Sequence, residues 1–288
     1  MKDVMKSPRA RAAVALALEE DIGPGDATSA ALVDSRAVAE GRIFSRVPCV
    51  VSGATVARAV LRAVDPGVKT KILLPDGSRA EAGRDILVFK GRARSILAAE
   101  RTALNFMQRM CATATLARSF VDAVAPWGTM ILDTRKTNPG LRVFDKYAVL
   151  CGGGTNHRFG LYDRILMKDN HRRLWSGGDP DRLDEAVRAA RKAFPKLAVE
   201  VEVESLRECR SALKARPEWI MLDNMSCADM RKCAAMCKGI SLTEASGGIS
   251  LSRVRKVAAT GVDAISLGCL THSAGSIDLT LEWKETGR

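Results

Sequence analysis

Four short apolar runs recur in residues 199–268, which read VEVEVESLRECRSALKARPEWIMLDNMSCADMRKCAAMCKGISLTEASGGISLSRVRKVAATGVDAISLG. The runs are Val199–Glu204, Ile220–Leu222, Ile240–Leu242 and Ala264–Leu267. They follow one another at roughly 20-residue intervals, the length of one strand–helix unit. Each run ends in polar residues or a glycine. This repeat predicts parallel strands joined by crossover helices.

Two further runs extend the pattern upstream. Met130–Leu132 precedes the polar stretch Asp133–Lys136, and Ile165–Met167 precedes Lys168–Asn170. Fully buried parallel strands should be apolar along their length, and these runs are apolar until their C-terminal ends. In a βα barrel the active site is built at the C-terminal ends of the strands. A count nearer six or seven than eight predicts an incomplete, open α/β barrel of parallel strands with a polar site at one face.

Residues before position 115 have a different pattern of apolar runs and turns. Three runs predict short strands: Arg42–Val51, Val68–Leu74 and Asp85–Gly91. Ile96–Val124 has apolar residues at helical spacing and predicts a long helix. We therefore expect an N-terminal α/β domain over residues 1–115 and a barrel over residues 116–274. The tail, residues 275–288, is expected to pack back on the first domain.

The net charge of +12 admits two interpretations. A basic chain suits a nucleic-acid or membrane surface, or a site that gathers polyanionic small molecules. Lys and Arg are spread along the chain and aromatic residues make up 5%, whereas nucleic-acid binders tend to carry basic blocks or exposed aromatics. The apolar stretch Ala12–Leu18 runs into acidic residues and predicts a first helix, not a targeting segment. We expect a cytoplasmic protein that binds neither nucleic acid nor membrane.

The eight cysteines include no CxxC pair. Cys227, Cys233 and Cys237 are close in sequence, but none of the three histidines lies near them. A zinc site is therefore poorly supported, and reduced thiols are the favoured interpretation.

The basic residues at the strand ends share a chemistry. They are Arg135, Lys136, Arg158 and Lys168, with His157 beside Arg158. Arginine suits carboxylates through its planar fork, and lysine supplies a compact charge for phosphates. Such a set neutralises several negative groups at once, which predicts transfer among carboxylated and phosphorylated small molecules.

Acidic and glycine-rich strand ends complete the pattern. Glu202 and Asp223 are carboxylates that favour a hard cation such as Mg²⁺ bridged to phosphate oxygens. The turn Ser246–Gly248 and Gly268 can present backbone N–H groups to phosphate. Plainer interpretations exist: an edge strand for the alternating acids of residues 199–204, a helix-capping turn at Asp223, a loop histidine at 272. The placement of all these residues at predicted strand ends favours a binding site.

Several long motifs resemble, in order, those of the quinolinate phosphoribosyltransferase family, also called nicotinate-nucleotide pyrophosphorylases (carboxylating). The motifs are Glu20–Asp26, Glu100–Asn105, Asp133–Arg142, Lys146–Val149, Gly152–Arg158, Leu166–His171, Glu244–Gly248 and Gly261–Ser273. Agreement among several long motifs is more specific than one short pattern. The resemblance implies Mg²⁺-dependent transfer from phosphoribosyl pyrophosphate to quinolinate with decarboxylation, which gives nicotinate mononucleotide for NAD synthesis. It also implies an N-terminal α/β sandwich beside the incomplete barrel.

The resemblance assigns roles to single positions for the acidic substrate. Arg135, His157, Arg158 and Lys168 resemble the residues that hold the two carboxylates of quinolinate, and Thr134 and Lys136 join this substrate-binding set. Arg101 resembles a residue that reaches the site from the partner subunit of a homodimer, or of a hexamer.

The remaining assignments concern phosphoribosyl pyrophosphate. Lys136 and Lys168 would face this substrate, and Glu202 and Asp223 resemble the residues that hold Mg²⁺ and the ribose hydroxyls. These four form the implied catalytic set. The implied phosphate cradle consists of Ser246, Gly247, Gly248, Leu267, Gly268, Cys269 and His272.

Three alternatives stay open. A paralogue of the same fold found with molybdenum transport acts on another acceptor, but it tends to lack the element present here at Asn156–Arg158. A basic nucleic-acid-binding protein would bind in a salt-sensitive manner without turnover. A catalytically silent barrel would tolerate loss of Lys136 or Glu202. One departure from the family pattern is the loop Arg172–Asp181, which could line the mouth of the site.

Overall fold

The computed structural model describes residues 3–176 and 179–284. These residues form two compact units, and the chain passes between them more than once. The described part of the first unit comprises residues 3–118, 136–153 and 269–284, and that of the second comprises residues 119–135, 154–176 and 179–268. The boundary at residue 115 treats each domain as one continuous piece and stays a prediction, whereas the contacts group the chain discontinuously.

The first unit contains helices η1 (Val4–Lys6), α1 (Pro8–Ile22), α2 (Ala27–Leu32), α3 (Ala54–Val64), most of α4 (Ala93–Val124), α5 (Arg142–Cys151) and α11 (Cys269–His272). Its strands are β1 (Val38–Ser45), β2 (Cys49–Val50), β3 (Lys69–Ile72), β4 (Arg79–Ala80), β5 (Asp85–Arg92) and β12 (Leu279–Trp283). The first helix and the long helix both occur where the apolar spacing predicts them.

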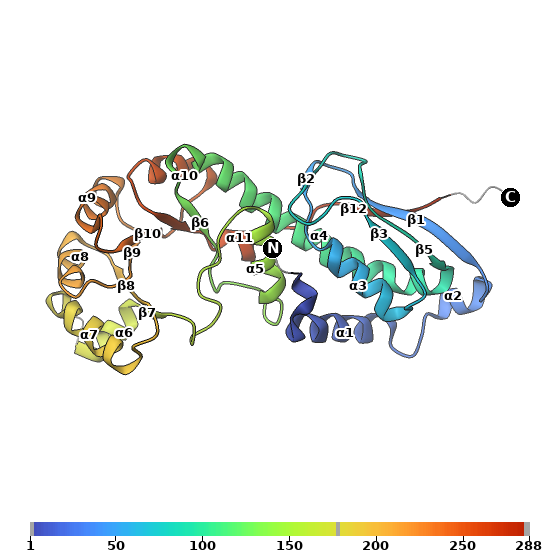
Figure 1. Cartoon of the computed structure of the whole chain (residues 1–288), viewed down its shortest axis with the longest axis horizontal. Coiled ribbons are helices and arrows are strands. Elements are labelled where there is room, and N and C mark those ends of the chain that lie inside the picture. Colours follow the sequence, from blue (N-terminus) through green and yellow to red (C-terminus); the bar gives the residue numbers. More distant parts are fainter. Residues whose placement is uncertain (1–2, 177–178, 285–288) are drawn as a thin grey trace. The chain divides into compact units, whose positions relative to one another are not determined.

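Four of these strands form an antiparallel sheet in the order β12-β1-β5-β3. Helices α3 and α4 run along one side of it, which gives a two-layer α/β sandwich (Figure 1). The strand β12 comes from the end of the chain and pairs with β1. Gly41 permits this pairing, because a Cβ atom there would lie 2.4 Å from the carbonyl oxygen of Glu282 and 2.5 Å from the ring of Phe89.

The single strand expected at Arg42–Val51 is wrong. β1 ends at Ser45, and β2 pairs with β4 in a separate two-stranded sheet. Pro48 lies in the break and has no N–H to donate to a strand ladder. The Ser45 hydroxyl donates to the carbonyl of Val47 at 2.6 Å, which stabilises the bend.

The second unit contains strands β6 (Met130–Leu132), β7 (Ile165–Met167), β8 (Val199–Val203), β9 (Trp219–Asp223), β10 (Leu242–Ser246) and β11 (Ala264–Ser266). Its helices are η2 (Ala125–Trp127), α6 (Asp169–Ser176), η3 (Pro180–Arg182), α7 (Leu183–Ala193), α8 (Leu206–Leu213), α9 (Cys227–Cys237) and α10 (Leu251–Ala258).

The six strands form one parallel sheet in the order β6-β11-β10-β9-β8-β7. Within the described residues, the end strands β6 and β7 are not paired with each other, so the curved sheet stays open. Helices α7 to α10 lie outside the arc of strands (Figure 1). The predicted open α/β barrel of parallel strands is therefore confirmed.

Strand β8 shows how the alternating acids are accommodated. All five of its residues are buried, including Glu200 and Glu202. It lies between β7 and β9, so the edge-strand interpretation is wrong. Because side chains two apart share one face of a strand, the two acids point the same way.

The segment expected as a loop at Arg172–Asp181 is largely helical. Helix α6 extends to Ser176, and η3 begins at Pro180. The pair Asp169–Arg173, one turn apart at 3.9 Å, places an acid at the start of α6 and a base near its end, which favours the helix. Gly177 and Gly178 lie outside the described residues, and the expected position of the segment at the mouth of a site stays a prediction.

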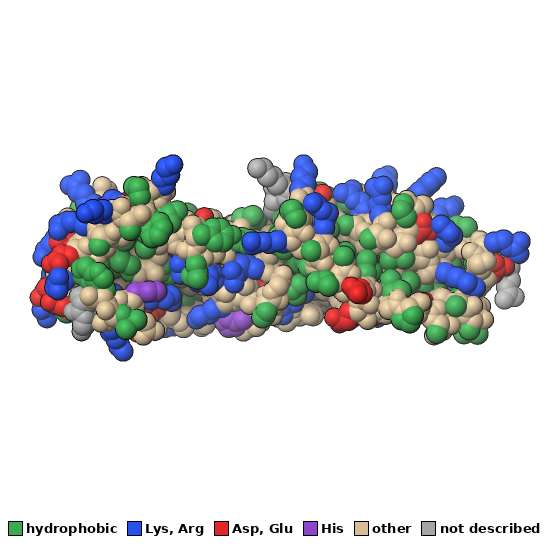
Figure 2. Space-filling model, turned by 90° about the horizontal axis from the view of Figure 1, so that it is seen from below, with side chains coloured by type: hydrophobic (Ala, Val, Ile, Leu, Met, Phe, Trp, Pro, Cys, Tyr) green, Lys and Arg blue, Asp and Glu red, His purple; other side chains and the backbone are tan. Residues whose placement is uncertain are grey.

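Basic side chains are scattered over the surface. In Figure 2, Lys and Arg side chains are spread along the visible face of both units instead of forming one block. Within residues 3–176 and 179–284, no helix combines the length and apolar character that a membrane crossing requires.

Candidate functional site

The polar residues expected at the strand ends lie at the C-terminal edge of the open barrel. Arg135 follows β6, Lys168 follows β7, Glu202 lies near the end of β8, Asp223 and Ser246 end β9 and β10, and Gly268 follows β11. Asp223 and Ser246 are register partners on neighbouring strands. Since all six strands are parallel, these positions share one edge.

Lys168 and Glu202 are brought together directly. Their Nζ and Oε2 atoms are 3.5 Å apart. The backbone N–H of Asp169 donates to the other carboxylate oxygen of Glu202 at 3.3 Å. The Glu202 side chain is 7% exposed and that of Lys168 is 48% exposed, so the carboxylate is fixed while the ammonium group stays accessible.

Asp223 is not a helix cap. Ser226 is the N-cap of α9, and its hydroxyl accepts from the backbone N–H of Asp229. The side-chain amide of Asn224 donates to Asp223 at 2.8 Å and orients its carboxylate. The capping interpretation of Asp223 is therefore wrong, and this carboxylate at the strand end requires another role.

The turn after β10 depends on glycine. Gly247 has φ +100°, and a Cβ there would lie 2.1 Å from the side-chain oxygen of Asn224. Asn224 has φ 52°, and its N–H donates to the carbonyl of Ser246 at 3.0 Å. The two strand ends are thus joined by a backbone hydrogen bond, and the Asn224 side chain packs against the backbone of Gly247.

His157 and Arg158 are both 7% exposed. The buried carboxylate of Asp133, just after β6, accepts from the N–H of His157 at 2.9 Å. Arg158 donates to the carbonyl of Arg164 at 3.1 Å. Burial lowers the pKa of Arg158, and the nearby positive charge of Arg135 lowers it further. Two arginines expected to bind carboxylates therefore repel each other, and a bound anion would relieve that repulsion.

Two fully buried acids lie against His157, and we did not expect them as site residues. His157 Nε2 is 3.1 Å from Glu200 Oε2 and 3.4 Å from Glu244 Oε2. Arg164 Nη1 lies 3.1 Å from the same oxygen of Glu200. The alternation in residues 199–204 indicated acids on one face of a strand, and Glu244 belongs to a family motif, but no sequence signal indicated Arg164.

The pKa values of Glu200 and Glu244 shift in opposite directions. Burial and then the charge of Glu200 raise the pKa of Glu244 to about 7. Burial also opposes ionisation of Glu200, but its hydrogen bond and charge pairing with His157, and the charge of Arg164, hold its pKa below the usual value. Burial lowers the pKa of His157, but the two carboxylates outweigh it and raise that pKa to about 9.

Four predicted site residues belong to the first unit: Arg101, Lys136, Cys269 and His272. Arg101 is exposed on α4, and Lys136 is exposed in the segment before α5. The carbonyl of Lys136 accepts from the Thr271 hydroxyl at 2.7 Å, which ties this segment to α11. His272 is hydrogen-bonded to its neighbour Ser273.

The cysteines do not form a metal site among the described residues. All eight are free thiols, and Cys209 and Cys237 pack with their sulfurs 3.8 Å apart. Among residues 3–176 and 179–284, His157, Glu200 and Glu244 instead bring possible ligand atoms within 4.8 Å of one another.

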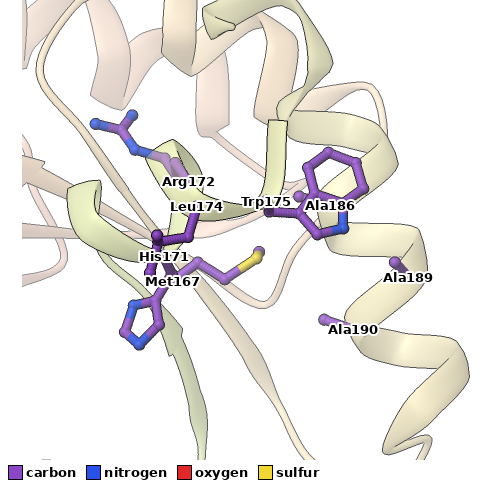
Figure 3. Close-up of a pocket in the computed structure, with 8 residues that line it drawn as sticks. All are labelled: Met167, His171, Arg172, Leu174, Trp175, Ala186, Ala189 and Ala190. Carbon is purple, nitrogen blue, oxygen red and sulfur yellow. The ribbon is translucent and has the colours of Figure 1, made fainter. Parts of the chain in front are cut away.

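A cavity of about 430 Å³ lies between α6 and α7. Met167, Trp175 and three alanines of α7 line it, and the guanidinium of Arg172 points away from it (Figure 3). Arg172 instead pairs with Glu208 at 2.9 Å. The cavity is mainly apolar and does not suit a polyanion.

An open barrel of parallel strands with polar groups at the C-terminal strand ends is the architecture of an α/β-barrel enzyme. Two family models match the chain: "Quinolinate phosphoribosyl transferase, C-terminal domain" over residues 113–282, and the N-terminal domain of the same enzyme over residues 26–111. The chain belongs to the quinolinate phosphoribosyltransferase family.

Individual relatives agree with the family models. The chain is 41% identical to a nicotinate-nucleotide pyrophosphorylase [carboxylating] from Mycobacterium leprae, over 95% of this chain and 96% of that one. It is 38% identical to a chloroplastic rice protein of the same name, over 94% of this chain and 77% of that one. The solved nicotinate-nucleotide pyrophosphorylase from Francisella tularensis has a TM-score of 0.90 at 36% identity, covering 99% of this chain and 100% of that one.

Proposed function

We propose that the chain transfers the phosphoribosyl group of phosphoribosyl pyrophosphate to quinolinate and removes one carboxylate as CO₂. The products are nicotinate mononucleotide and pyrophosphate, and the reaction serves NAD synthesis. Membership of the family across nearly the whole chain carries this proposal. The grouping of Arg135, Arg158, Lys168 and Glu202 in the barrel unit supports it.

The basic residues would bind quinolinate. Arg135 and Arg158 would bind the ring carboxylates, with His157, Lys168 and Thr134 beside them. The mutual repulsion of the two arginines favours a dianion over a monoanion. Positioning matters because the ring nitrogen that must attack is crowded by the adjacent carboxylate.

The family's reaction uses a divalent metal ion, and we propose Mg²⁺. Glu202 and Asp223 would hold it together with the ribose hydroxyls, and oxygen donors of this kind suit a hard cation. The fit rests on a fixed, 7% exposed Glu202 carboxylate and on an Asp223 carboxylate that caps no helix. When bound, the ion would offset negative charge on the departing pyrophosphate.

The side chains need form no covalent bond with substrate. Lys136 and Lys168 would stabilise the leaving pyrophosphate while the ring nitrogen bonds to C1 of the ribose. The backbone from Ser246 to Gly248 and from Leu267 to Cys269, with His272, would hold the 5′-phosphate. The transferred ring is then cationic, so the electron pair left by departing CO₂ is stabilised by the neighbouring positive nitrogen until the ring carbon takes up a proton from water.

The assembly is proposed to be a homodimer or a hexamer. Arg101 would enter the neighbouring subunit's site, and its exposure on α4 in the single chain leaves it accessible for that role.

A direct assay tests the function. The purified protein is mixed with quinolinate, phosphoribosyl pyrophosphate and Mg²⁺, and nicotinate mononucleotide is followed by chromatography. We expect product that disappears with EDTA and returns with Mg²⁺. Arg135→Ala should lower kcat/KM for quinolinate by at least about ten-fold, since a hydrogen bond to a charged group contributes about 1.5–3 kcal/mol.

Other outcomes would point elsewhere. If folded protein consumes another acceptor but not quinolinate, the fold assignment holds and the substrate assignment is wrong, as for the molybdenum-associated paralogue. If nothing turns over and the protein binds any nucleic acid in a salt-dependent manner, the basic surface is the functional feature.

A further inference from the structure

Glu200 and Glu244 form a buried acidic pair inside the barrel that the proposed reaction does not use. Both side chains are 0% exposed, and they come from β8 and β10, which β9 separates. A buried carboxylate costs free energy unless charge or hydrogen bonds compensate it. The pair therefore needs a structural or functional reason.

One of their partners, His157, belongs to the proposed acid-recognition group, and the other is Arg164. One oxygen, Glu200 Oε2, faces both His157 Nε2 and Arg164 Nη1 at 3.1 Å. Glu244 Oε2 approaches the same ring nitrogen from the neighbouring side at 3.4 Å. The two acids thus converge on one imidazole, and Glu200 also contacts one guanidinium.

The imidazole is hydrogen-bonded at Nδ1 and faces the two carboxylates at Nε2. The backbone N–H of Arg158 donates to His157 Nδ1 at 2.7 Å, so the ring proton lies on Nε2, between the carboxylates. Arg164 is held on its other side by Trp219, whose ring centroid is 5.0 Å from the guanidinium carbon. The carbonyl of Arg164 then accepts from the guanidinium of Arg158 at 3.1 Å. A continuous set of contacts runs from Glu200 to Arg158.

We propose that Glu200 and Glu244 are positioning residues that orient His157 and, through Arg164, Arg158 for recognition of the acidic substrate. The proposal rests on the proposed function, because it concerns the residues that bind quinolinate there. Neither acid touches substrate. Hydrogen-bonded partners behind a binding residue typically contribute ten-fold or more to its performance.

The central variant is Glu200→Gln, which keeps the shape of the side chain and removes the charge that faces both His157 and Arg164, with Glu244→Gln as a second. We expect KM for quinolinate to rise about ten-fold while KM for phosphoribosyl pyrophosphate stays unchanged and kcat changes less. Glu218→Gln is the matched control. Glu218 pairs with Arg191 at 3.1 Å and accepts from the N–H of Val199 at 2.7 Å, at the opposite ends of the strands. Its KM values should equal those of the wild type.

NMR can detect the contact between His157 and the two acids in the absence of substrate. The His157 ring N–H proton should give a downfield NMR signal that is absent in His157→Gln. This signal should shift in Glu244→Gln and Glu200→Gln and stay in place in Glu218→Gln. If quinolinate is not a substrate at all, the proposed function fails, and the NMR measurement still decides whether the acids hold His157.

Three results would overturn the proposal. The first is an unchanged ring signal in both variants. The second is a parallel change of both KM values with a lowered melting temperature, which marks the pair as merely structural. The third is a divalent metal bound in the wild type at one per chain and lost in Glu244→Gln, because His157, Glu200 and Glu244 would then be its ligands.

Discussion

At the residue scale, the Asn224 side chain packs directly against the backbone of Gly247 where two neighbouring strands end. Both residues have positive φ, and the position of a Cβ at Gly247 is already occupied by the Asn224 side-chain oxygen, 2.1 Å away. The proposed phosphate-binding turn therefore has a shape that only glycine permits.

Gly247→Ala tests this requirement. We expect the substitution to lower the unfolding free energy by about 1–3 kcal/mol and to raise KM for phosphoribosyl pyrophosphate, because the turn must shift. Denaturant unfolding and steady-state kinetics measure the two effects. Gly261→Ala is the control, since Gly261 has φ +89° but open space around its Cβ position. Equal effects of the two substitutions on KM would contradict the argument.

Some site residues can be predicted from the sequence, and others cannot. Lys168, Glu202 and Asp223 could be predicted because each lies at or near the C-terminal end of an expected strand, and parallel strands place such ends at one edge. Arg164 could not, because its importance arises from contacts with Glu200 and Trp219, which lie 36 and 55 positions further along the chain.

At the scale of elements, β8 and β10 carry acids through positions that a parallel strand normally fills with apolar side chains. The compensation comes from His157 and Arg164, so the strands and the connecting segments depend on each other. The protonation of this cluster should therefore affect the stability of the barrel.

The pH dependence has a definite sign. Folding raises the pKa of Glu244 to about 7 and that of His157 to about 9. In an unfolded chain the pKa values of glutamate and histidine are about 4.3 and 6.5. The folded state holds more protons in this range, so the stability that these groups contribute is present at low pH and lost as the pH rises. The Arg158 N–H that donates to Nδ1 opposes a second ring proton and moves the His157 part of the effect to lower pH.

The measurement compares melting temperatures. We expect the melting temperature of the wild type to fall relative to that of Glu244→Gln as the pH is raised from about 5 to about 9, because only the wild type has to ionise this buried carboxyl. The same scan with Glu218→Gln serves as the control. A difference that stays constant across the range would show that the Glu244 carboxyl does not change its protonation with the fold.

Elements could be predicted where one local pattern dominates. The long helix α4 and five of the six short strands follow from apolar spacing. The strand expected at Ile240–Leu242 is wrong, because β10 runs over Leu242–Ser246 and buries the polar residues Thr243 and Glu244. The break between β1 and β2 was missed because Pro48 was read as part of one apolar run. The helical part of Arg172–Asp181 was missed because the glycines after it suggested a loop.

At the scale of the whole molecule, the first unit is assembled from three separated segments. Its sheet is completed by β12, whose Leu279 and Leu281 are buried in the core of that unit. We expected the tail to pack on this unit but not to supply an edge strand, because pairing between distant segments leaves no local trace in the sequence.

Leu281→Ala measures what this strand contributes. We expect a loss of about 2–4 kcal/mol in the free energy of unfolding, the usual cost of truncating a buried leucine. Thr280→Ala is the neighbouring control, since Thr280 is only partly buried and contacts the exposed Arg46. Urea titrations of both variants provide the comparison, and equal losses would mean that β12 packs weakly.

The pairing of β1 with β12 also sets an order of events on the ribosome. Arg42 and Glu282, which bond across these strands, are 240 positions apart. At bacterial and eukaryotic elongation rates, β1 emerges on the order of tens of seconds before its partner. During that interval its outer edge is open to other nascent chains. Newly made chains should therefore depend most on chaperones before the final strand leaves the exit tunnel.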